Sequence, residues 1–225
     1  MATRTTRAGP ARREEAAERP VAVIVAIFTV EAGDLQVLLI KRSAEPFKDQ
    51  WSLPGGLLLR DQSLIEAATR RLDIETGVTD VFLEQLYTFS GLDDRGSMAV
   101  AYWALVDRGS ARLARRDEWQ PAWCGVADLP PLAFRNDEVV SYALTRLQNK
   151  LAYSNVAYSL LPAEFSLSQL QQVYEAILSR PLDKRNFRKR ILSLGILEAT
   201  GRRASEGRHR PAQMYRFRER RPVVL

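Results

Sequence analysis

The longest apolar run in the chain is Val21 to Val30, ten residues rich in β-branched side chains. A membrane-spanning helix needs about 20 apolar residues, so this run is too short to cross a bilayer and indicates a β-strand. A second apolar run, Leu35 to Ile40, follows after the short polar segment Glu31 to Asp34, which contains a glycine. Two such runs around a short polar turn predict a β-hairpin.

The first helix is predicted just after the break at Leu53-Pro54-Gly55-Gly56. Ser63 stands three residues before Glu66, the capping-box spacing at which each side chain satisfies a backbone amide at a helix start. We expect the helix to run to about Thr76 and to stop at Gly77, because a residue without Cβ adopts the left-handed conformation easily.

Further strands are predicted around residues 82–89 and 98–106, and a second helix over residues 137–151. In that helix Val140, Leu144, Leu147 and Leu151 recur at helical spacing, and Asn136 or Asp137 is the expected N-cap. Strands that alternate with two helices predict an α/β layer structure for residues 21–154.

A second domain is predicted from residue 155 onward, because Asn155 to Phe165 interrupts the α/β pattern. Ser166 and Gln169 form another capping box, and Leu167, Leu170, Val173, Tyr174 and Ile177 make one apolar stripe. Asp183 is expected to cap a further helix that ends at Gly195, with Phe187, Ile191 and Leu194 facing inward. Two short strands around residues 196–200 and 214–217 then enclose a basic loop. This layout predicts a winged helix-turn-helix.

The basic charge is concentrated in this second domain. From residue 150 onward there are 15 Lys and Arg against 6 Asp and Glu, whereas residues 1–149 hold 18 against 21. Residues 1–20 contain five arginines and no large apolar side chain, which predicts a disordered tail. The single cysteine, Cys124, excludes an intrachain disulfide, and with the single histidine, His209, it excludes a Cys/His zinc cluster. We therefore expect a cytoplasmic protein.

The segment Gly56 to Val78 resembles the Nudix box, G-x5-E-x7-R-E-U-x-E-E-x-G-U with U apolar. The matching positions are Gly56, Arg70, Leu72, Glu75, Gly77 and Val78. The segment before the box, Trp51-Ser52-Leu53-Pro54-Gly55, is also typical of the family. The resemblance implies a Nudix α/β/α sandwich with a mixed sheet, and a pocket suited to nucleoside-diphosphate compounds.

The box departs from the family pattern at its metal-binding positions. In that family three glutamates on the helix hold Mg²⁺; here those positions are Arg71, Ile74 and Glu75, and the earlier glutamate is Gln62. Because Mg²⁺ requires hard anionic oxygen ligands, hydrolysis should be absent or vestigial, and neither a metal nor a catalytic residue is expected. The expected effector-binding residues are Arg42, Trp51, Gly55, Gly56, Arg70, Arg71 and Glu75.

Structural roles stay open for several of these residues. Arg70 and Glu75 would equally serve to hold the helix to its neighbouring loop, and Trp51 would serve as a packed aromatic residue. The box as a whole would also serve as a scaffold around an empty pocket.

The basic surface of the second domain predicts binding to duplex DNA. The predicted helix that begins at Asp183 supplies residues suited to base edges, the wing supplies residues suited to phosphates or the minor groove, and two serines at a helix start can donate to phosphate. The expected DNA-binding residues are Ser166, Ser168, Lys184, Arg185, Asn186, Arg188, Lys189, Arg202, Arg203, Arg208, His209 and Arg210.

The combination resembles the Nudix-related transcriptional regulators of the NrtR type over nearly all of residues 20–218. The segments that carry this resemblance in the DNA-binding part are Asn155 to Pro162, Gln171 to Leu178 and Pro181 to Arg188. The resemblance implies a homodimeric repressor of NAD-metabolism genes that binds a palindromic operator and responds to ADP-ribose or a related nucleotide. No cofactor is then required.

Two other functions fit the same sequence features. One is an active ADP-ribose pyrophosphatase with a basic nucleic-acid-binding appendage, which would release AMP in the presence of Mg²⁺ or Mn²⁺. The other is an RNA-associated Nudix protein, which would prefer A-form duplexes over operator DNA.

Overall fold

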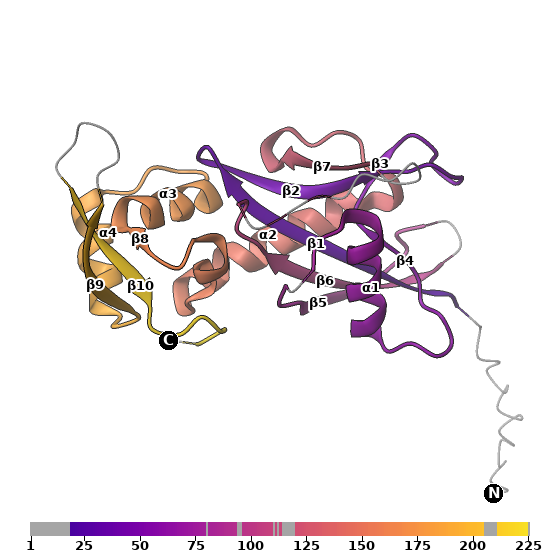
Figure 1. The fold of residues 1–225 in the computed structure, drawn as a ribbon. Coiled ribbons are helices and arrows are strands. Elements are labelled where there is room, and N and C mark those ends of the chain that lie inside the picture. Colours follow the sequence, from indigo (N-terminus) through magenta and orange to yellow (C-terminus); the bar gives the residue numbers. More distant parts are fainter. Residues whose placement is uncertain are drawn as a thin grey trace, which may run out of the picture.

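The N-terminal half of the chain forms a seven-stranded mixed sheet (Figure 1). A computed structural model describes residues 19–79, 81–93, 96–109, 111, 113, 120–204 and 211–224, so most of the predicted tail, residues 1–18, lies outside the described part. The strands of this sheet are β1 Val21–Glu31, β2 Asp34–Lys41, β3 Trp51–Ser52, β4 Gly55–Leu57, β5 Glu84–Ser90, β6 Met98–Leu105 and β7 Gln120–Gly125.

The main strand order is β3-β2-β1-β6-β5, with β4 paired to β1 and β7 paired to β2. Strands β1 and β6 are parallel and the other pairs are antiparallel. The predicted β1–β2 hairpin is confirmed, and its two turn residues, Ala32 and Gly33, have φ of 52° and 90°. Positive φ at both positions is the backbone geometry that matches the twist of a two-residue hairpin.

Two helices cover opposite faces of this sheet (Figure 1). Helix α1, Leu64–Thr76, packs through Ala68 and Leu72 on the face that Val23 and Val25 present, while α2, Asn136–Tyr153, covers the other face. Strand residues of alternating sequence number point to opposite faces, so β1 contributes to both cores. The expected α/β/α sandwich is therefore present.

Helix α1 begins and ends where the sequence predicts. Ser63 Oγ accepts the amide of Glu66 at 3.3 Å, the Glu66 carboxylate accepts the Ser63 amide at 2.9 Å, and Gly77 follows the helix with φ of 75°. Local chemistry alone accounts for both ends of this helix.

The N-cap prediction for α2 is wrong. Arg135, with φ of 49°, stands at the cap without a side-chain cap bond, and Asn136 is already the first helical residue. Asn136 is 2% exposed, and its Oδ1 accepts the backbone amide of Leu53 at 2.9 Å. The Asn136 side chain therefore binds the loop before the Nudix box, although the local sequence pattern predicts that it caps the helix.

The C-terminal part is a winged helix domain whose order is strand, two helices and two strands. Its elements are β8 Phe165–Ser166, α3 Leu167–Leu178, α4 Lys184–Ser193, β9 Leu197–Ala204 and β10 Ala212–Phe217, and the sheet order is β8-β10-β9. Ser166 caps α3 with the predicted capping box, and Asp183 Oδ1 accepts the Asn186 amide at 2.8 Å. Phe187 and Ile191 are buried as predicted, whereas Leu194 is 37% exposed because α4 ends before it.

The two parts share one continuous hydrophobic core. Leu147 and Leu151 of α2 belong to the same buried cluster as Leu170 and Ile177 of α3, and Gln148 donates to the Ile177 carbonyl at 3.0 Å. Short 3-10 helices connect the remaining elements at Val126–Asp128, Ala133–Arg135 and Val156–Leu160. None of the described helices is long and apolar enough to cross a membrane.

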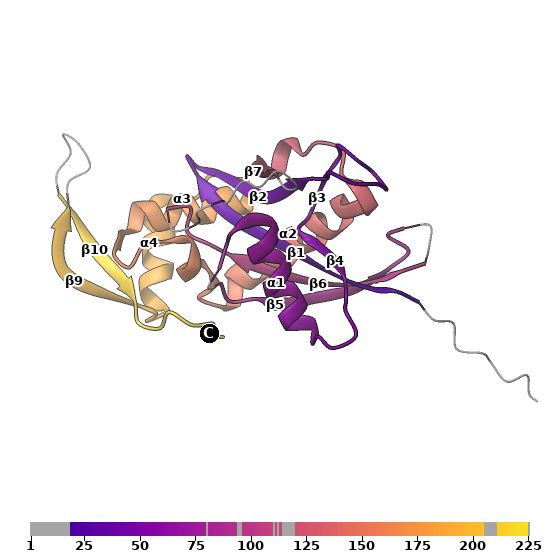
Figure 2. The same ribbon diagram turned by 45° about the vertical axis from the view of Figure 1, so that its right-hand side comes forward.

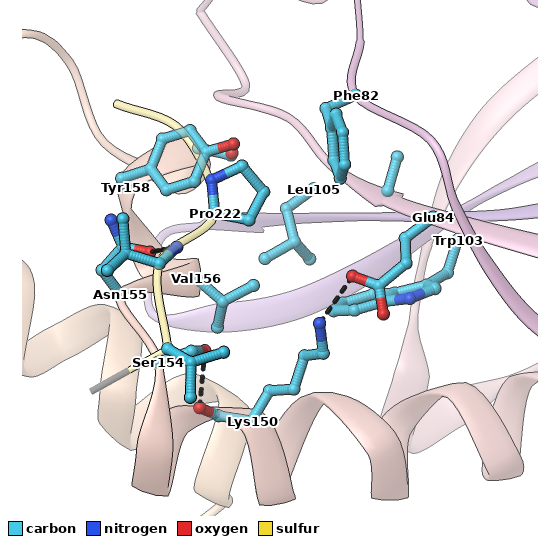
Figure 3. A pocket seen from close by; sticks show the side chains of 14 residues that line it. Phe82, Glu84, Trp103, Leu105, Lys150, Ser154, Asn155, Val156, Tyr158 and Pro222 are labelled. Atoms are coloured by element: carbon cyan, nitrogen blue, oxygen red, sulfur yellow. Dashed lines mark hydrogen bonds and ion pairs between the residues drawn. The ribbon is translucent and has the colours of Figure 1, made fainter. Parts of the chain in front are cut away.

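The C-terminal segment returns to this junction (Figure 3). Asn155, 2% exposed, donates through Nδ2 to the carbonyls of Glu219 and Arg221 and accepts the Val223 amide at 2.8 Å. Beside it, Lys150 of α2 forms an ion pair with Glu84 of β5 next to the Trp103 ring. The segment after β10 is thus fastened to the connection between α2 and α3, and α2 is fastened to β5.

Candidate effector pocket and DNA-binding surface

The loop before the Nudix box approaches β1 closely enough to require glycine. A Cβ at Gly55 would lie 2.4 Å from the carbonyl oxygen of Val23, and one at Gly56 would lie 2.6 Å from Cζ of Arg71. A Cβ at Gly55 would collide with the β1 backbone, so the β4–β1 pairing requires glycine there, whereas a Cβ at Gly56 would meet the movable end of the Arg71 side chain. This geometry holds whatever the pocket binds.

Glu75 is the retained glutamate of the box, and it is fully buried. Its Oε2 accepts the Gly55 amide at 2.8 Å, and its Oε1 lies 3.4 Å from Nη1 of Arg71. Burial raises the pKa of Glu75 to about 7, although the Gly55 amide and the charges of Arg71 and Arg42 oppose that rise. Glu75 therefore holds α1 to the loop, which is one of the two roles that the sequence left open.

Arg71 stands at the position of a metal-binding glutamate and lies against Gly56, with its side chain 28% exposed. Ile74 and Gln62, at two further positions of the family's glutamates, are partly buried and neutral. Within the described ranges, no group of three His, Cys, Asp or Glu side chains could hold a metal ion. The donor set of this box does not suit Mg²⁺, which requires several anionic oxygens.

A cavity of about 460 Å³ opens beside the loop and the Nudix box. Of the predicted effector residues, Arg42, Gly55 and Gly56 line it, whereas Trp51, Arg70, Arg71 and Glu75 do not. The full lining is Pro20, Ala22, Ile24, Arg42, Pro46, Phe47, Ser52, Leu53, Gly55, Gly56, Leu57, Leu92, Asp93, Ser97, Ala99, Phe134 and Asn136.

Three of the predicted effector residues have other surroundings. Trp51 packs against the core, in agreement with the packed-aromatic alternative, and its backbone forms an isolated β-bridge with Leu132. Arg70 is exposed and makes no hydrogen bond or ion pair to the described residues, so it does not hold α1 to the loop. Arg71 reaches the cavity wall only through its packing on Gly56.

An arginine and two aromatic rings form one rim of the cavity. The Arg42 guanidinium lies 4.8 Å from the centroid of Phe134, and Phe47 meets Phe134 edge-on at 4.8 Å. Burial lowers the pKa of Arg42, against the attraction of Glu75 and Glu45. Phe47 and Phe134 have φ of 64° and 55°, conformations that non-glycine residues rarely adopt. No sequence pattern singled out these two phenylalanines, because strain and long-range ring contact leave no local signal.

Helix α4 presents the predicted recognition residues to solvent. Lys184, Arg185, Asn186 and Lys189 are exposed, while Arg188 is partly buried and its Nη2 lies 3.5 Å from the Ser168 hydroxyl. Arg188 is therefore turned toward the start of α3. Figure 2 shows α4 beside the β9–β10 hairpin, at the end of the molecule away from α1.

The predicted wing and helix-start residues differ in their exposure and contacts. Arg203 is exposed, and Arg202, also exposed, forms an ion pair with Glu164 at 3.0 Å; Arg208, His209 and Arg210 lie outside the described residues. Ser166 is only 5% exposed and its hydroxyl accepts the Gln169 amide. A buried capping hydroxyl is poorly placed for a phosphate contact, so the expectation for Ser166 is corrected.

Comparison with known proteins agrees with this architecture. The NUDIX domain model matches residues 18–143, and that of the NrtR DNA-binding winged helix domain matches residues 157–217. The ADPR responsive transcriptional repressor NtrR of Acinetobacter baylyi is 38% identical over 202 residues, which cover 87% of this chain and 80% of that protein. The chain belongs to the NrtR family.

Solved structures of another NrtR superpose on this member of the family. Shewanella oneidensis NrtR complexed with a 27mer DNA has a TM-score of 0.78 at 34% identity, covering 88% of this chain and 93% of that chain. The NUDIX domain of the same protein, complexed with ADP ribose, has a TM-score of 0.53 at 32% identity, covering 58% and 90% respectively. The NrtR arrangement of a Nudix domain followed by a winged helix domain thus extends over most of this chain.

Proposed function

We propose that this NrtR-family chain is a transcriptional repressor of NAD-metabolism genes whose Nudix domain binds ADP-ribose, or a related nucleotide, without cutting it. The observation that carries this proposal is the arginine at the Nudix box: Arg71 stands where the family has a metal-binding glutamate and packs on Gly56, a wall residue of the cavity. The names of the relatives, a repressor responsive to ADPR and an NrtR solved with DNA, support it.

The charge balance of the site favours an anion over a metal ion. Arg42 and Arg71 lie near the carboxylate of Glu75, whose pKa burial raises to about 7, and Asp93 is the one acidic residue among those that line the cavity. At about 4 Å an arginine repels a divalent ion by on the order of several kcal/mol at an effective dielectric near 20. A diphosphate carries the opposite charge, so the same arginines attract it.

The DNA-binding surface combines α4 with the wing. Lys184, Arg185, Asn186 and Lys189 enter the major groove, and Ser168, Arg202 and Arg203 contact phosphates or the minor groove. Two copies of the chain form a homodimer that places two α4 helices on the half-sites of a palindromic operator. If each winged domain neutralises about six phosphates, log affinity falls with log salt at a slope near −5 per half-site.

Helix α2 connects the effector cavity with the winged domain. Asn136, at the start of α2, lines the cavity and accepts the Leu53 amide. Near the end of α2, Gln148 donates a hydrogen bond to α3, and Leu147 belongs to the same buried cluster as α3. Its 18 residues span about 27 Å at 1.5 Å per residue. An effector that prefers one position of α2 shifts the relative arrangement of the two winged domains and thereby the operator affinity.

Two binding measurements and one assay test this proposal. Calorimetric titration of ADP-ribose should give saturable binding without added metal, weakened by Arg71→Glu but not by Arg70→Glu, the matched change at the exposed neighbouring position. Selection of bound duplexes from genomic fragments, with and without ADP-ribose, should recover a palindromic site whose occupancy depends on the nucleotide. Identical operator affinity in both conditions, or undiminished affinity in Arg71→Glu, contradicts the mechanism.

The rival function is an ADP-ribose pyrophosphatase, which the retained Glu75 and glycine loop favour. Release of AMP from ADP-ribose with Mg²⁺ or Mn²⁺ separates the two functions. We expect no turnover above background, and brisk turnover by a protein that ignores duplex DNA would establish the rival.

A further inference from the structure

Three aromatic side chains form an exposed patch where β5, the edge strand at one end of the sheet, meets helix α2. The ring centroids of Tyr87 and Tyr142 lie 5.0 Å apart, and the Phe89 centroid lies 5.2 Å from Tyr87 and 5.6 Å from Tyr142. Tyr87 is 51% exposed and Tyr142 is 37% exposed, while Phe89 is partly buried. These three rings, here called the aromatic patch, are a cluster of the kind that marks an interaction surface.

The fold holds the aromatic patch in place. Tyr87 and Phe89 pair with two alanines of β6 that belong to the core beneath α2, so both rings point to the α2 side of the sheet. At the start of α2, Arg135 donates to the carbonyl of Gly91, just after β5, at 3.1 Å. Because strand and helix are fastened to each other, the patch has little conformational freedom to lose when a partner binds.

Opposite charges flank Tyr142 at equal distances along α2. Glu138 stands four residues before Tyr142 and Arg146 four residues after it, and residues four apart share one face of a helix. The Arg146 guanidinium lies 6.0 Å from the Tyr142 ring and forms no ion pair with any residue that the structure describes. Glu138 pairs only with the exposed side chain of Arg135. The surface therefore carries an acid at one end, aromatic rings in the middle and a base at the other end.

This order of charges is complementary to itself. In a two-fold dimer whose α2 helices lie antiparallel about Tyr142, a residue four positions after Tyr142 faces the residue four positions before it on the other chain. Arg146 then faces Glu138 of the partner subunit, and the symmetry makes this contact twice. A nucleic acid does not fit the same surface, because its phosphates would meet the Glu138 carboxylate.

We infer that the aromatic patch is the dimer interface, occupied by a second copy of this chain whose α2 lies antiparallel about Tyr142, with Arg146 paired to Glu138 of the partner subunit. Tyr, Phe and Arg are the side chains enriched at the cores of protein interfaces. The inference rests on the homodimer of the proposed function and adds the surface through which it forms. It also puts the two-fold axis on the helix that connects the effector cavity with the winged domain.

Sedimentation equilibrium of two charge variants tests the inference. Arg146→Glu and Glu138→Arg each bring like charges face to face in the antiparallel arrangement, so each variant alone should dimerise about tenfold or more weakly than the wild type. In an equimolar mixture every contact joins opposite charges, and the dimer should return to within about threefold of the wild-type affinity. Positions 138 and 146 lie about 12 Å apart along one helix, so this restoration reports a contact between two chains.

Two further variants complete the test. Tyr142→Ala should weaken dimerisation by about tenfold or more, because aromatic residues at the centre of an interface carry much of its binding energy. Arg60→Glu makes the same charge change as Arg146→Glu at an exposed position before α1 and should leave dimerisation unchanged. Thermal melts at dilutions where each protein is monomeric should agree with the wild type; a fold lost in Tyr142→Ala leaves the mixture of charge variants to decide.

The outcomes that contradict the inference are distinct from those that contradict the proposed function. A dimer that survives Arg146→Glu, Glu138→Arg and Tyr142→Ala has its two-fold axis elsewhere, and the aromatic patch then serves a different partner. A mixture that fails to restore the dimer refutes the antiparallel pairing. Either result leaves the proposed function standing, whereas a wild type that stays monomeric at every concentration removes the homodimer from that function as well.

Discussion

Replacement of Glu75 by glutamine isolates the cost of burying the one glutamate that the Nudix box retains at its metal-binding positions. Glu75 is fully buried, and its pKa of about 7 lies above its ordinary value of 4.5 because burial outweighs the Gly55 amide and the two arginines. Glutamine keeps an oxygen that can accept the Gly55 amide, and it removes both the charge and the titration. The variant therefore changes the electrostatics of this position with little change in shape.

The magnitude and its pH dependence follow from the two pKa values. A group that holds its proton more tightly in the folded protein stabilises the fold below pH 4.5 and loses that contribution as the pH rises through about 7. The difference corresponds to about 3 kcal/mol at 1.36 kcal/mol per pKa unit. Glutamine also loses the 3.4 Å contact with Arg71, so we expect Glu75→Gln to be more stable than the wild type by about 2–3 kcal/mol at pH 8.

Urea denaturation at pH 5, 6, 7 and 8 measures this difference. The free energies of unfolding of Glu75→Gln and the wild type should lie close together at pH 5 and separate at pH 8; the difference at pH 8 corresponds to a shift of roughly 4–12 °C in a thermal melt. Glu138→Gln makes the same change at an exposed position of α2 and should show no such separation. A Glu75→Gln protein that is less stable than the wild type at pH 8 would refute the reasoning, because the arginines would then outweigh burial.

Three further predictions concern contacts between distant parts of the chain. Asn136→Ala should lower the free energy of unfolding by about 1–3 kcal/mol, measured in urea, because it leaves the buried Leu53 amide unpaired. Asn155→Ala removes three hydrogen bonds to the C-terminal segment and should expose that segment to limited proteolysis, whereas equal protection in the variant would argue against a fastening role. Arg203→Ala should reduce duplex affinity and lower the magnitude of the salt slope by about one, and an unchanged slope would remove Arg203 from the phosphate contacts.

Features that depend on neighbours in the chain could be read from the sequence. The β1–β2 hairpin, the caps at Ser63, Ser166 and Asp183, and the end of α1 at Gly77 all follow from turn and capping chemistry within a few residues. The arginine at the metal position could be read in the same way, because the spacing of the Nudix box identifies each position of the helix.

Features that depend on contacts between distant parts of the chain could not be read from the sequence. The sequence offered Asn136 as a cap and Trp51 as a candidate ligand residue, yet the fold uses the first to hold Leu53 and packs the second into the core. The packing of Arg71 on Gly56 and the rim of Phe47 and Phe134 likewise require elements from separate parts of the chain to meet. Capping and turn preferences act over three or four residues, whereas the cavity is built by packing between residues up to more than a hundred positions apart, and only the tertiary structure decides which side chains reach it.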